Sequence, residues 1–269
     1  MPIVTQTNVA SLETQKNLFR SQAALQKSFS RLSSGHRINS AADDAAGLAI
    51  SESMRTQIRS YVVAERNASD AISMTQTAEG ALGEMHSILG RLRELAMQGS
   101  NGSMTATDRG YLSTEFSALQ AEMTRIQASS KFNGKSLLSA TASSLTFQVG
   151  LNNTASDKVT LTFGGLGLTT LLAATTNLSG AGTTASLTAL GRIDSALATI
   201  STSRARFGAA MNRFEVVTSS IQTMRLNLSA ANSRIRDVDV AEETSALARN
   251  QVLSQAGVAV LAQANQLPQ

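Results

Sequence analysis

The sequence contains no cysteine and no tryptophan, and both of its prolines stand at the ends of the 269-residue chain. Without cysteine the chain forms no disulfide and no thiolate-ligated metal site. Because the prolines are Pro2 and Pro268, the whole interior is free of the residue that most strongly breaks helices. Aromatic residues make up only 4% of the chain, although 42% of it is hydrophobic. The core must therefore be built from aliphatic side chains, which suits packed helices.

Basic runs and long apolar runs are also missing. The 23 Lys and Arg residues and 19 Asp and Glu residues are spread along the chain. No stripe of positive charge or nucleic-acid module is visible, so we expect no nucleic-acid partner. No stretch approaches the ~18 apolar residues of a membrane span, and the N-terminus lacks a basic region followed by an apolar one. We expect no membrane contact and no cleaved signal peptide, so a secreted form requires another export route.

Residues for catalysis are scarce. His36 and His86 are the only histidines, and a Ser-His-Asp triad would have to be assembled from two distant helices. The glycine-containing turns do not follow a predicted strand, so neither a dinucleotide nor a P-loop signature applies. We therefore expect no enzyme activity, no catalytic residue, no metal and no cofactor.

Helical periodicity dominates the chain. From Tyr61 to Ala96, alternating steps of three and four residues meet apolar or aromatic side chains at every position except Thr75. Further seams run through 112–126 and 190–235, the latter interrupted by polar residues such as Arg204. Such repeats are typical of coiled coils. We predict a mainly α fold, an elongated rod of long antiparallel coiled-coil-like helices.

Near mid-chain the spacing of apolar residues changes from every three or four residues, as in a helix, to every two, as in a strand. Asn133-Gly134 is a turn signal that ends the second seam. Apolar residues then alternate with polar ones on two segments, which predicts a β-hairpin: Leu145, Phe147, Val149, Val159, Leu161 and Phe163. The following stretch, 164–186, is rich in Gly, Thr, Ser and Ala, and we expect an exposed, weakly ordered loop.

Both ends of the chain lack charge. Residues 1–12 and 250–269 contain no charged side chain, yet Leu253, Val260 and Leu267 recur at helical spacing. One interpretation is frayed termini. The other is that both ends stay disordered until they pack against other copies. The second is favoured, because disordered tails are usually more charged.

A stretch beginning at Arg31, RLSSGHRINSAADDAAGLAISES, contains glycine, histidine and paired acids but indicates a corner rather than a reactive site. Gly35 is suited to end a helix because it tolerates positive φ. Ser40 is placed to cap the next helix, with Asp43 reaching back to it. Arg37 lies in the connection between them.

Several long motifs resemble those of bacterial flagellin, the subunit of the flagellar filament. They occur in the order RLSSGHRINSAADDAAGLAI, ERNASDAISMTQTAEGAL, RLRELAMQ, FNGK, SRIRDVDVAEET and NQVLSQAGVAVLAQANQLPQ, and cover nearly the whole chain. The resemblance implies an extracellular structural protein that polymerises for motility and is exported by the flagellar type III route. The short stretch between Lys135 and Leu187 implies a minimal form without outer domains. Family members usually continue past the position of Gln269, which leaves the contacts of that tail open.

The resemblance also implies a division of the chain and a set of partners. Terminal helices form an inner coiled coil, and longer helices form a shell around it. The segments are 1–40 (inner-tube helix and connection), 41–140 (outer-shell helices), 141–186 (β-hairpin and loop), 187–236 (returning helix) and 237–269 (inner-tube helix). The partners are other copies of the chain, the flagellar cap and hook-associated proteins, an export chaperone, and the host Toll-like receptor for flagellin.

Specific residues are implied for three roles. Arg91 and Leu95 share a helix face that points partly away from the seam, and with Glu115 they match positions engaged by the receptor. The polymerising inner-tube residues are Leu12, Leu18, Leu25, Leu253, Val260, Leu261 and Leu267. Glycosylation at Thr175, Thr176 and Ser179 is weighed against an unmodified loop, and intact mass decides between them. The alternatives are a hook–filament junction protein and, from another class, a signalling coiled coil.

Overall fold

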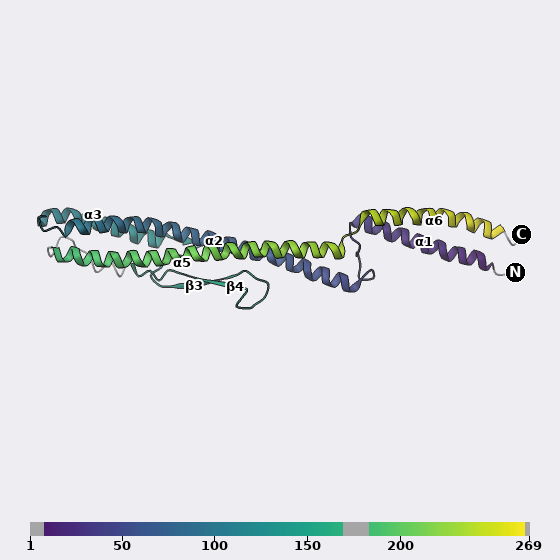
Figure 1. Cartoon of the computed structure of the whole chain (residues 1–269), viewed down its shortest axis with the longest axis horizontal. Helices are drawn as coiled ribbons and strands as arrows, with labels where there is room; N and C mark the ends of the chain where they lie inside the picture. Colours follow the sequence, from purple (N-terminus) through teal and green to yellow (C-terminus); the bar gives the residue numbers. More distant parts are fainter. Residues whose placement is uncertain (1–7, 169–182, 267–269) are drawn as a thin grey trace. The chain divides into compact units, whose positions relative to one another are not determined.

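The chain is mainly α-helical, as the heptad seams predict. The computed structural model describes residues 8–168 and 183–266 (Figure 1). Within them lie helices α1 (Val9–Ser34), α2 (Ala45–Gly99), α3 (Ala106–Ser129), α5 (Thr183–Arg236) and α6 (Val240–Gln266). The contacts divide the chain into two compact units. We call the described parts of Met1–Arg59 and Met224–Gln269 the terminal unit, and those of Ser60–Thr223 the central unit.

The core of the central unit follows the seam predicted on α2. Its leucines, among them Leu82, Leu89 and Leu92, are fully buried against α3 and α5 residues of the same cluster. Thr75, the polar member of that seam, is also buried, and its hydroxyl donates to the carbonyl of Ala71 at 2.7 Å. The hydroxyl thereby satisfies its hydrogen bond within the helix, which explains how a polar residue is tolerated there.

Polar pairs fix the register of α2 against α5 in the central unit. Arg93 pairs with Asp194 at 2.8 Å, and Arg204 pairs with Glu79 at 2.7 Å. The two pairs run in opposite directions along the helices, so α2 and α5 are antiparallel. Apolar heptads alone allow a slip by one repeat, whereas such a slip separates these charges. Arg204, which interrupts the predicted seam, therefore helps to fix the register of α5 against α2.

Two small antiparallel hairpins follow α3. Strands β1 (Lys131–Phe132) and β2 (Lys135–Ser136) flank the Asn133-Gly134 turn, whose φ angles are 45° and 76°. Both values are positive, as a tight type I′ hairpin turn requires. Strands β3 (Ser143–Gln148) and β4 (Lys158–Phe163) form the predicted hairpin, with Phe147 opposite Val159.

Aromatic side chains attach the β3–β4 hairpin to α5. Phe147 meets Phe214 edge-on with ring centroids 5.6 Å apart, and Phe163 lies 5.4 Å from Phe207. Edge-on and tilted aromatic pairs of this kind add specificity to simple burial. Four of the ten aromatic residues of the chain thus lie where this hairpin meets α5.

The expected exposed loop over 164–186 is wrong at both of its described edges. Leu166 and Leu168 are buried in the core of the central unit. At the other edge α5 already begins at Thr183, and Ser186 is fully buried. Small polar residues dominate the composition of this stretch, but Leu166 and Leu168 still provide apolar surface that packs into the core.

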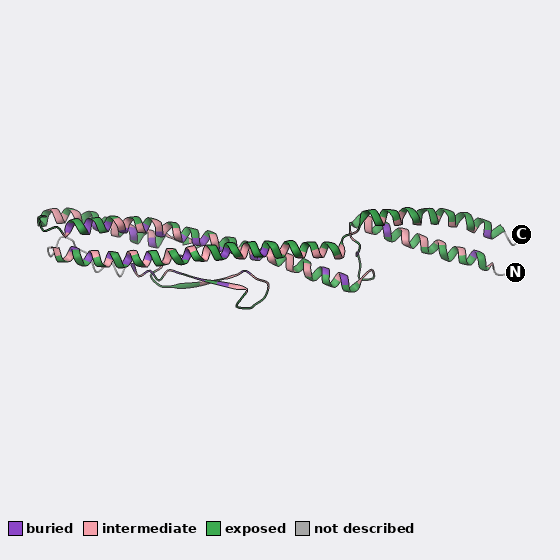
Figure 2. Ribbon diagram, in the orientation of Figure 1, coloured by how far each residue is buried: buried purple, intermediate pink, exposed green. Residues whose placement is uncertain are grey.

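The terminal unit contains α1 and α6 together with the adjoining ends of α2 and α5. Helices α1 and α6 lie side by side and antiparallel (Figure 1). Burial differs sharply from the central unit, because most residues of both helices are exposed (Figure 2). Residues 9–12 and 250–266, within the two ends, are helical in the single chain, which differs from the expectation that the ends stay disordered until they meet other copies. Contacts between α1 and α6 explain the difference, and they are described next.

Candidate functional site

The α1–α6 pair is held by small polar contacts and one close helix approach. Asn8 caps α1 by accepting from the backbone N–H of Ser11 at 3.0 Å, and its Nδ2 donates to the carbonyl of Ala264 at 2.7 Å. A Cβ placed on Gly257 of α6 would lie 3.3 Å from Cδ1 of Leu18. Glycine at this position therefore lets Leu18 pack closely against α6.

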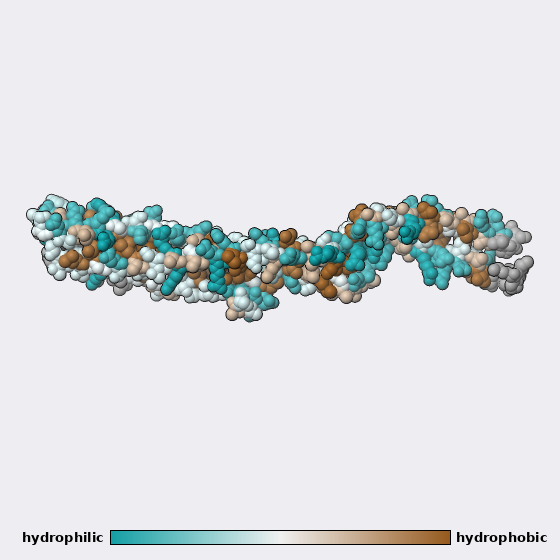
Figure 3. Space-filling view, in the orientation of Figure 1, coloured by the Kyte–Doolittle hydropathy of each residue, from teal (hydrophilic) through white to brown (hydrophobic). Residues whose placement is uncertain are grey.

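Large apolar side chains cover the outside of this pair. Each of the following is at least half exposed: Val9, Leu12, Phe19 and Phe29 on α1, and Val240, Val252, Leu253, Val258 and Val260 on α6. By contrast, the buried residues of the described parts of the two helices are small: Ser11, Ser28 and Ala264. Apolar surface is accordingly visible over both helices (Figure 3). We call these nine side chains the outer apolar face.

The residues predicted for polymerisation fall into two groups. Leu12, Leu253 and Val260 belong to the outer apolar face. Three others, Leu18, Leu25 and Leu261, are half-buried, while Leu267 lies outside the described residues. The sequence-based prediction missed six members of the face: Val9, Phe19, Phe29, Val240, Val252 and Val258. They lie off the single stripe that it followed, although the absence of charge after Arg249 was a usable signal for Val252 and Val258.

Hydrogen bonds link the segment between α1 and α2 to the segment between α5 and α6. We call this set of bonds, between residues 35–38 and 236–238, the joint. The N–H of Arg37 donates to the carbonyl of Arg236 at 2.6 Å, and the N–H of Val238 donates to the carbonyl of Gly35 at 3.1 Å. Gly35 ends α1 with φ of 71°, the left-handed conformation that the sequence predicts there. The guanidinium of Arg37 also donates to the carbonyl of Ile235 at 2.7 Å. Arg37 thus satisfies an otherwise unpaired carbonyl near the end of α5.

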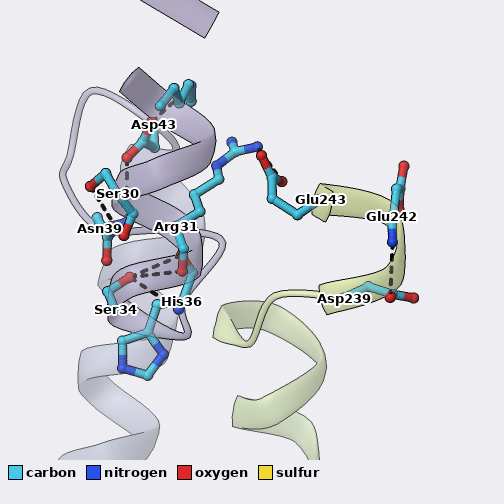
Figure 4. A network of polar contacts seen from close by, with 10 residues as sticks. Ser30, Arg31, Ser34, His36, Asn39, Asp43, Asp239, Glu242 and Glu243 are labelled. Carbon is cyan, nitrogen blue, oxygen red and sulfur yellow. Dashed lines mark hydrogen bonds and ion pairs between the residues drawn. The ribbon is translucent and has the colours of Figure 1, made fainter. Parts of the chain in front are cut away.

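Charged groups reinforce the joint from both terminal helices (Figure 4). Arg31 near the end of α1 lies 3.3 Å from the carboxylate of Glu243 in the first turn of α6. Asp239 accepts hydrogen bonds from the N–H groups of Ala241 and Glu242 and so caps α6. The negative charges of Asp239 and Glu243 both lie where the α6 dipole favours them.

The prediction that Ser40 caps α2 is wrong. Helix α2 begins at Ala45, and Asp44 rather than Ser40 accepts from the N–H of Gly47, at 2.8 Å. Asp43 does reach back to Ser40, accepting from its N–H and hydroxyl at 3.2 Å, but within a turn that precedes the helix. The reason is tertiary, because the ammonium of Lys27 on α1 lies 2.8 Å from the Asp43 carboxylate.

Acid is expected to weaken the contact between Lys27 and Asp43. The hydrogen bond from Lys27, with smaller contributions from the N–H groups of Ser40 and Asn39, outweighs desolvation and lowers the pKa of Asp43 to about 2. A carboxyl whose pKa is lowered on folding stabilises the fold above its unfolded pKa, and the contribution is lost as pH falls through the folded value. The loss therefore falls between about pH 4 and pH 2.

Thermal melts across this acid range check the expectation. Asp43→Asn is expected to have a lower melting temperature than the unaltered chain at neutral pH, and the difference is expected to shrink toward pH 2. Glu13→Gln, a change of an exposed carboxylate on α1, serves as the matched control. A constant difference between Asp43→Asn and the unaltered chain at every pH would contradict the role of the ion pair.

The three residues predicted for receptor contact lie in the central unit but differ in accessibility. Arg91 pairs with Glu115 of α3 at 2.8 Å and with Glu94 at 2.9 Å. Hydrogen bonds to Glu94 and Glu115 raise the pKa of Arg91. Leu95, however, is only 1% exposed and belongs to the core. The expectation that it points partly away from the seam is wrong, because α3 and α5 cover more of α2 than one stripe.

The remaining predictions concern glycosylation, the two histidines, metal binding and membrane contact. Thr175, Thr176 and Ser179 lie outside the described residues. His36 lies in the terminal unit, 3.6 Å from the Asp237 carboxylate, whereas His86 lies in the central unit. In residues 8–168 and 183–266, no group of three or more His, Asp or Glu side chains is placed to hold a metal ion. None of the helices described is long and apolar enough to cross a membrane.

Comparison with known proteins links both helical ends to one family. The family model described as the bacterial flagellin N-terminal helical region matches residues 5–143, and that of the C-terminal helical region matches 190–269. The chain is 43% identical to a flagellin of Halalkalibacterium halodurans, over 97% of this chain and 96% of the relative. It is 40% identical to the flagellar filament core protein flaB2 of Brachyspira hyodysenteriae, over 99% and 98% of the two chains.

Solved structures show related folds. The crystal structure of Bacillus cereus flagellin matches with a TM-score of 0.51 and 32% identity, over 62% of this chain and 94% of that one. A putative flagellar hook-associated protein from Vibrio parahaemolyticus matches with a TM-score of 0.62, over 72% of this chain and all of that one. Its identity is 14%, so this second likeness concerns the fold alone.

Proposed function

The chain belongs to the bacterial flagellin family, and from this premise we propose that it is a structural subunit that polymerises into the extracellular flagellar filament. The observation that carries the proposal is the outer apolar face of the α1–α6 pair. Soluble monomers rarely leave apolar patches larger than a few hundred Å² exposed, and larger ones mark interaction sites. Terminal helix pairs of other copies of the chain are the partners that the family implies.

The driving force in this proposal is apolar burial. Burying a fully exposed large apolar side chain stabilises a complex by about 1.5–3 kcal/mol, and the outer apolar face supplies nine side chains of which 50–69% is still exposed. The described part of α6 after Arg249 carries no charged residue. Packing copies along it therefore leaves no charge stranded in a dry interface, which would be costly.

The joint has a positioning role in the same proposal. Its backbone bonds between residues 35–38 and 236–238 keep both connections together. Helices α1 and α6 therefore leave it as a pair rather than as two independent tails. The proposed division assigns 1–40 and 237–269 to an inner tube, 41–140 and 187–236 to an outer shell, and 141–186 to the β region.

Seeded assembly tests the filament proposal. The purified chain is expected to stay in the supernatant when dilute, and to sediment as filaments visible by electron microscopy after addition of filament fragments or a precipitating salt. A chain that stops at dimers under all these conditions would favour a signalling coiled coil. Short assemblies that form only on hook ends would favour a hook–filament junction protein.

Export and assembly partners extend the proposal. An α6 helix with an exposed apolar face requires cover before assembly, which supports binding by an export chaperone. The route is the flagellar type III apparatus, and cap and hook-associated proteins contact the filament at its ends. Loss of the chain from culture medium when that apparatus is deleted would support the route. Undiminished secretion would contradict it.

Recognition of the monomer by the Toll-like receptor for flagellin is the last extension. Arg91 and Glu115 support it because both are substantially exposed and form one paired patch across α2 and α3. Leu95 contributes by packing, since it is buried. Arg91→Ala is expected to weaken receptor signalling about tenfold or more, as a contact worth more than ~1.4 kcal/mol would.

A reporter-cell dose response measures this loss. Arg93→Ala is the matched control, because Arg93 is a similarly exposed arginine of α2 that pairs with Asp194 on α5 instead. Equal loss of potency in both variants, or no loss in Arg91→Ala, would contradict the assignment of Arg91.

A further inference from the structure

Asparagine is followed by glycine twice in the described chain, at Asn101-Gly102 and Asn133-Gly134. The backbone nitrogen after an asparagine can attack the side-chain amide, and glycine obstructs that attack least because it lacks Cβ. All other asparagines of the described residues precede a residue with a side chain. We propose that Asn101 is a modification site, at which the amide converts spontaneously to a carboxylate, and that the fold protects Asn133 from the same reaction.

The reaction needs only water. The nitrogen of Gly102 loses its proton to solvent base and forms a bond to Cγ of Asn101. The bond from Cγ to the side-chain nitrogen then breaks, and ammonia leaves with a proton from solvent. Water adds to either carbonyl of the resulting five-membered imide and opens it. The products are aspartate, or isoaspartate in which the chain continues through the side chain.

The geometry around Asn101 favours ring closure. The residue lies in the exposed loop between α2 and α3, and its Oδ1 accepts from the N–H of Ser103 at 3.1 Å. A bond of this kind folds the asparagine side chain forward along the backbone, toward the nitrogen of Gly102. It also polarises the carbonyl that is attacked. A Cβ at Gly102 would meet no atom within 4 Å, so there is room for the ring and for water.

Asn133 has the same neighbour but a fixed backbone. With Gly134 it forms the two-residue turn between β1 and β2, and Phe132 pairs with Lys135 directly across it. A further bond runs from the N–H of Leu137 to the carbonyl of Ser130 at 3.0 Å. Closing the imide ring at Asn133 requires rotation about its backbone bonds, which disrupts the turn and the pairing on both sides.

Arg109 is placed to accommodate the new charge. Its Nε donates to the carbonyl of Gly99 at 3.1 Å, and its Nη2 donates to the carbonyl of Asn101 at 3.2 Å. A carboxylate just beyond the C-terminus of α2 is unfavourable to the helix dipole by itself. Next to this guanidinium the carboxylate is compensated, so the modified loop remains folded and the protein gains one negative charge at this position.

Peptide mass spectrometry of the full chain during incubation at mildly alkaline pH tests the proposal. The peptide with Asn101 is expected to gain the mass of an amide-to-acid exchange and to split into aspartate and isoaspartate forms. The rate is expected to be about tenfold or more above that at Asn133. In urea the two rates are expected to converge, because the hairpin no longer protects Asn133.

Four substitutions separate the fold's role from that of the local sequence. Gly102→Ala is expected to slow the conversion at Asn101, while Asn133→Gln is expected to leave it unchanged. Asn101→Asp is expected to melt at the temperature of the unaltered chain, whereas the double variant Asn101→Asp with Arg109→Ala is expected to melt below Arg109→Ala alone. Equal rates at both asparagines in the folded chain, or a rate ratio that survives unfolding, would overturn the proposal.

Discussion

Replacing Val252 and Leu253 by glutamine is expected to abolish filament formation while leaving the monomer folded. Both side chains are more than half exposed on α6. Their loss therefore removes little packing from the single chain, and glutamine is a good helix former. In the assembled state each contact that buries the remaining exposed half or more of such a side chain loses about 1 kcal/mol or more.

The expected loss is large because it recurs in every copy. Two such contacts weaken addition of one subunit by about 2 kcal/mol or more, or roughly thirtyfold. Sedimentation after seeding measures assembly, and circular dichroism measures the helicity and melting of the monomer. Gln251→Ala, a change at a neighbouring exposed position, is the matched control and is expected to assemble. Normal filaments from the double variant would contradict the proposal that the outer apolar face is the polymerising surface.

Phe214→Ala is expected to have the opposite effect, with a large loss of stability in the single chain. Phe214 is fully buried on α5 and meets Phe147 of the β3–β4 hairpin edge-on. Truncating a buried phenylalanine to alanine leaves a cavity and typically costs about 3–5 kcal/mol. The hairpin loses one of its two aromatic attachments to α5, so the damage is expected to reach the β region as well.

Phe19→Ala is the matched control, because it makes the same chemical change at a side chain that is 69% exposed on α1. Its effect on the monomer is expected to stay within about 0.5 kcal/mol, as for most surface substitutions, while assembly is expected to weaken. Urea denaturation, followed separately by helicity and by hydrogen exchange in the β3–β4 hairpin, measures both variants. Equal destabilisation by the two variants would contradict the division between buried core and outer apolar face.

Much of the secondary structure was predictable from periodicity. The seam predicted through 190–235 includes Phe207, Phe214 and Ile221 at seven-residue spacing, and all three are buried. The alternation around Phe147 predicted the β3–β4 hairpin, and Gly35 ends α1 as expected. These features depend on local geometry, namely the helical and strand repeats and the freedom of glycine to adopt positive φ.

The errors share a different origin. Ser40 had the right spacing for a helix cap, but Lys27, distant in sequence, draws Asp43 into a turn and moves the start of α2 to Ala45. Leu95 lay beside the predicted seam, yet the neighbouring helices bury it. In each case a contact between separate elements outweighed a preference of the local sequence.

The sequence by itself determined that this chain forms long helices, where the β-hairpin lies, and that the described part of α6 beyond Arg249 carries no charged side chain. These properties follow from the spacing and chemistry of neighbours along the chain. Only the tertiary structure decided which apolar side chains remain free. Leu18 packs against Gly257, whereas Leu12 and Phe19 on the same helix stay exposed. Periodicity places residues on a common face, but it does not specify which neighbour covers that face.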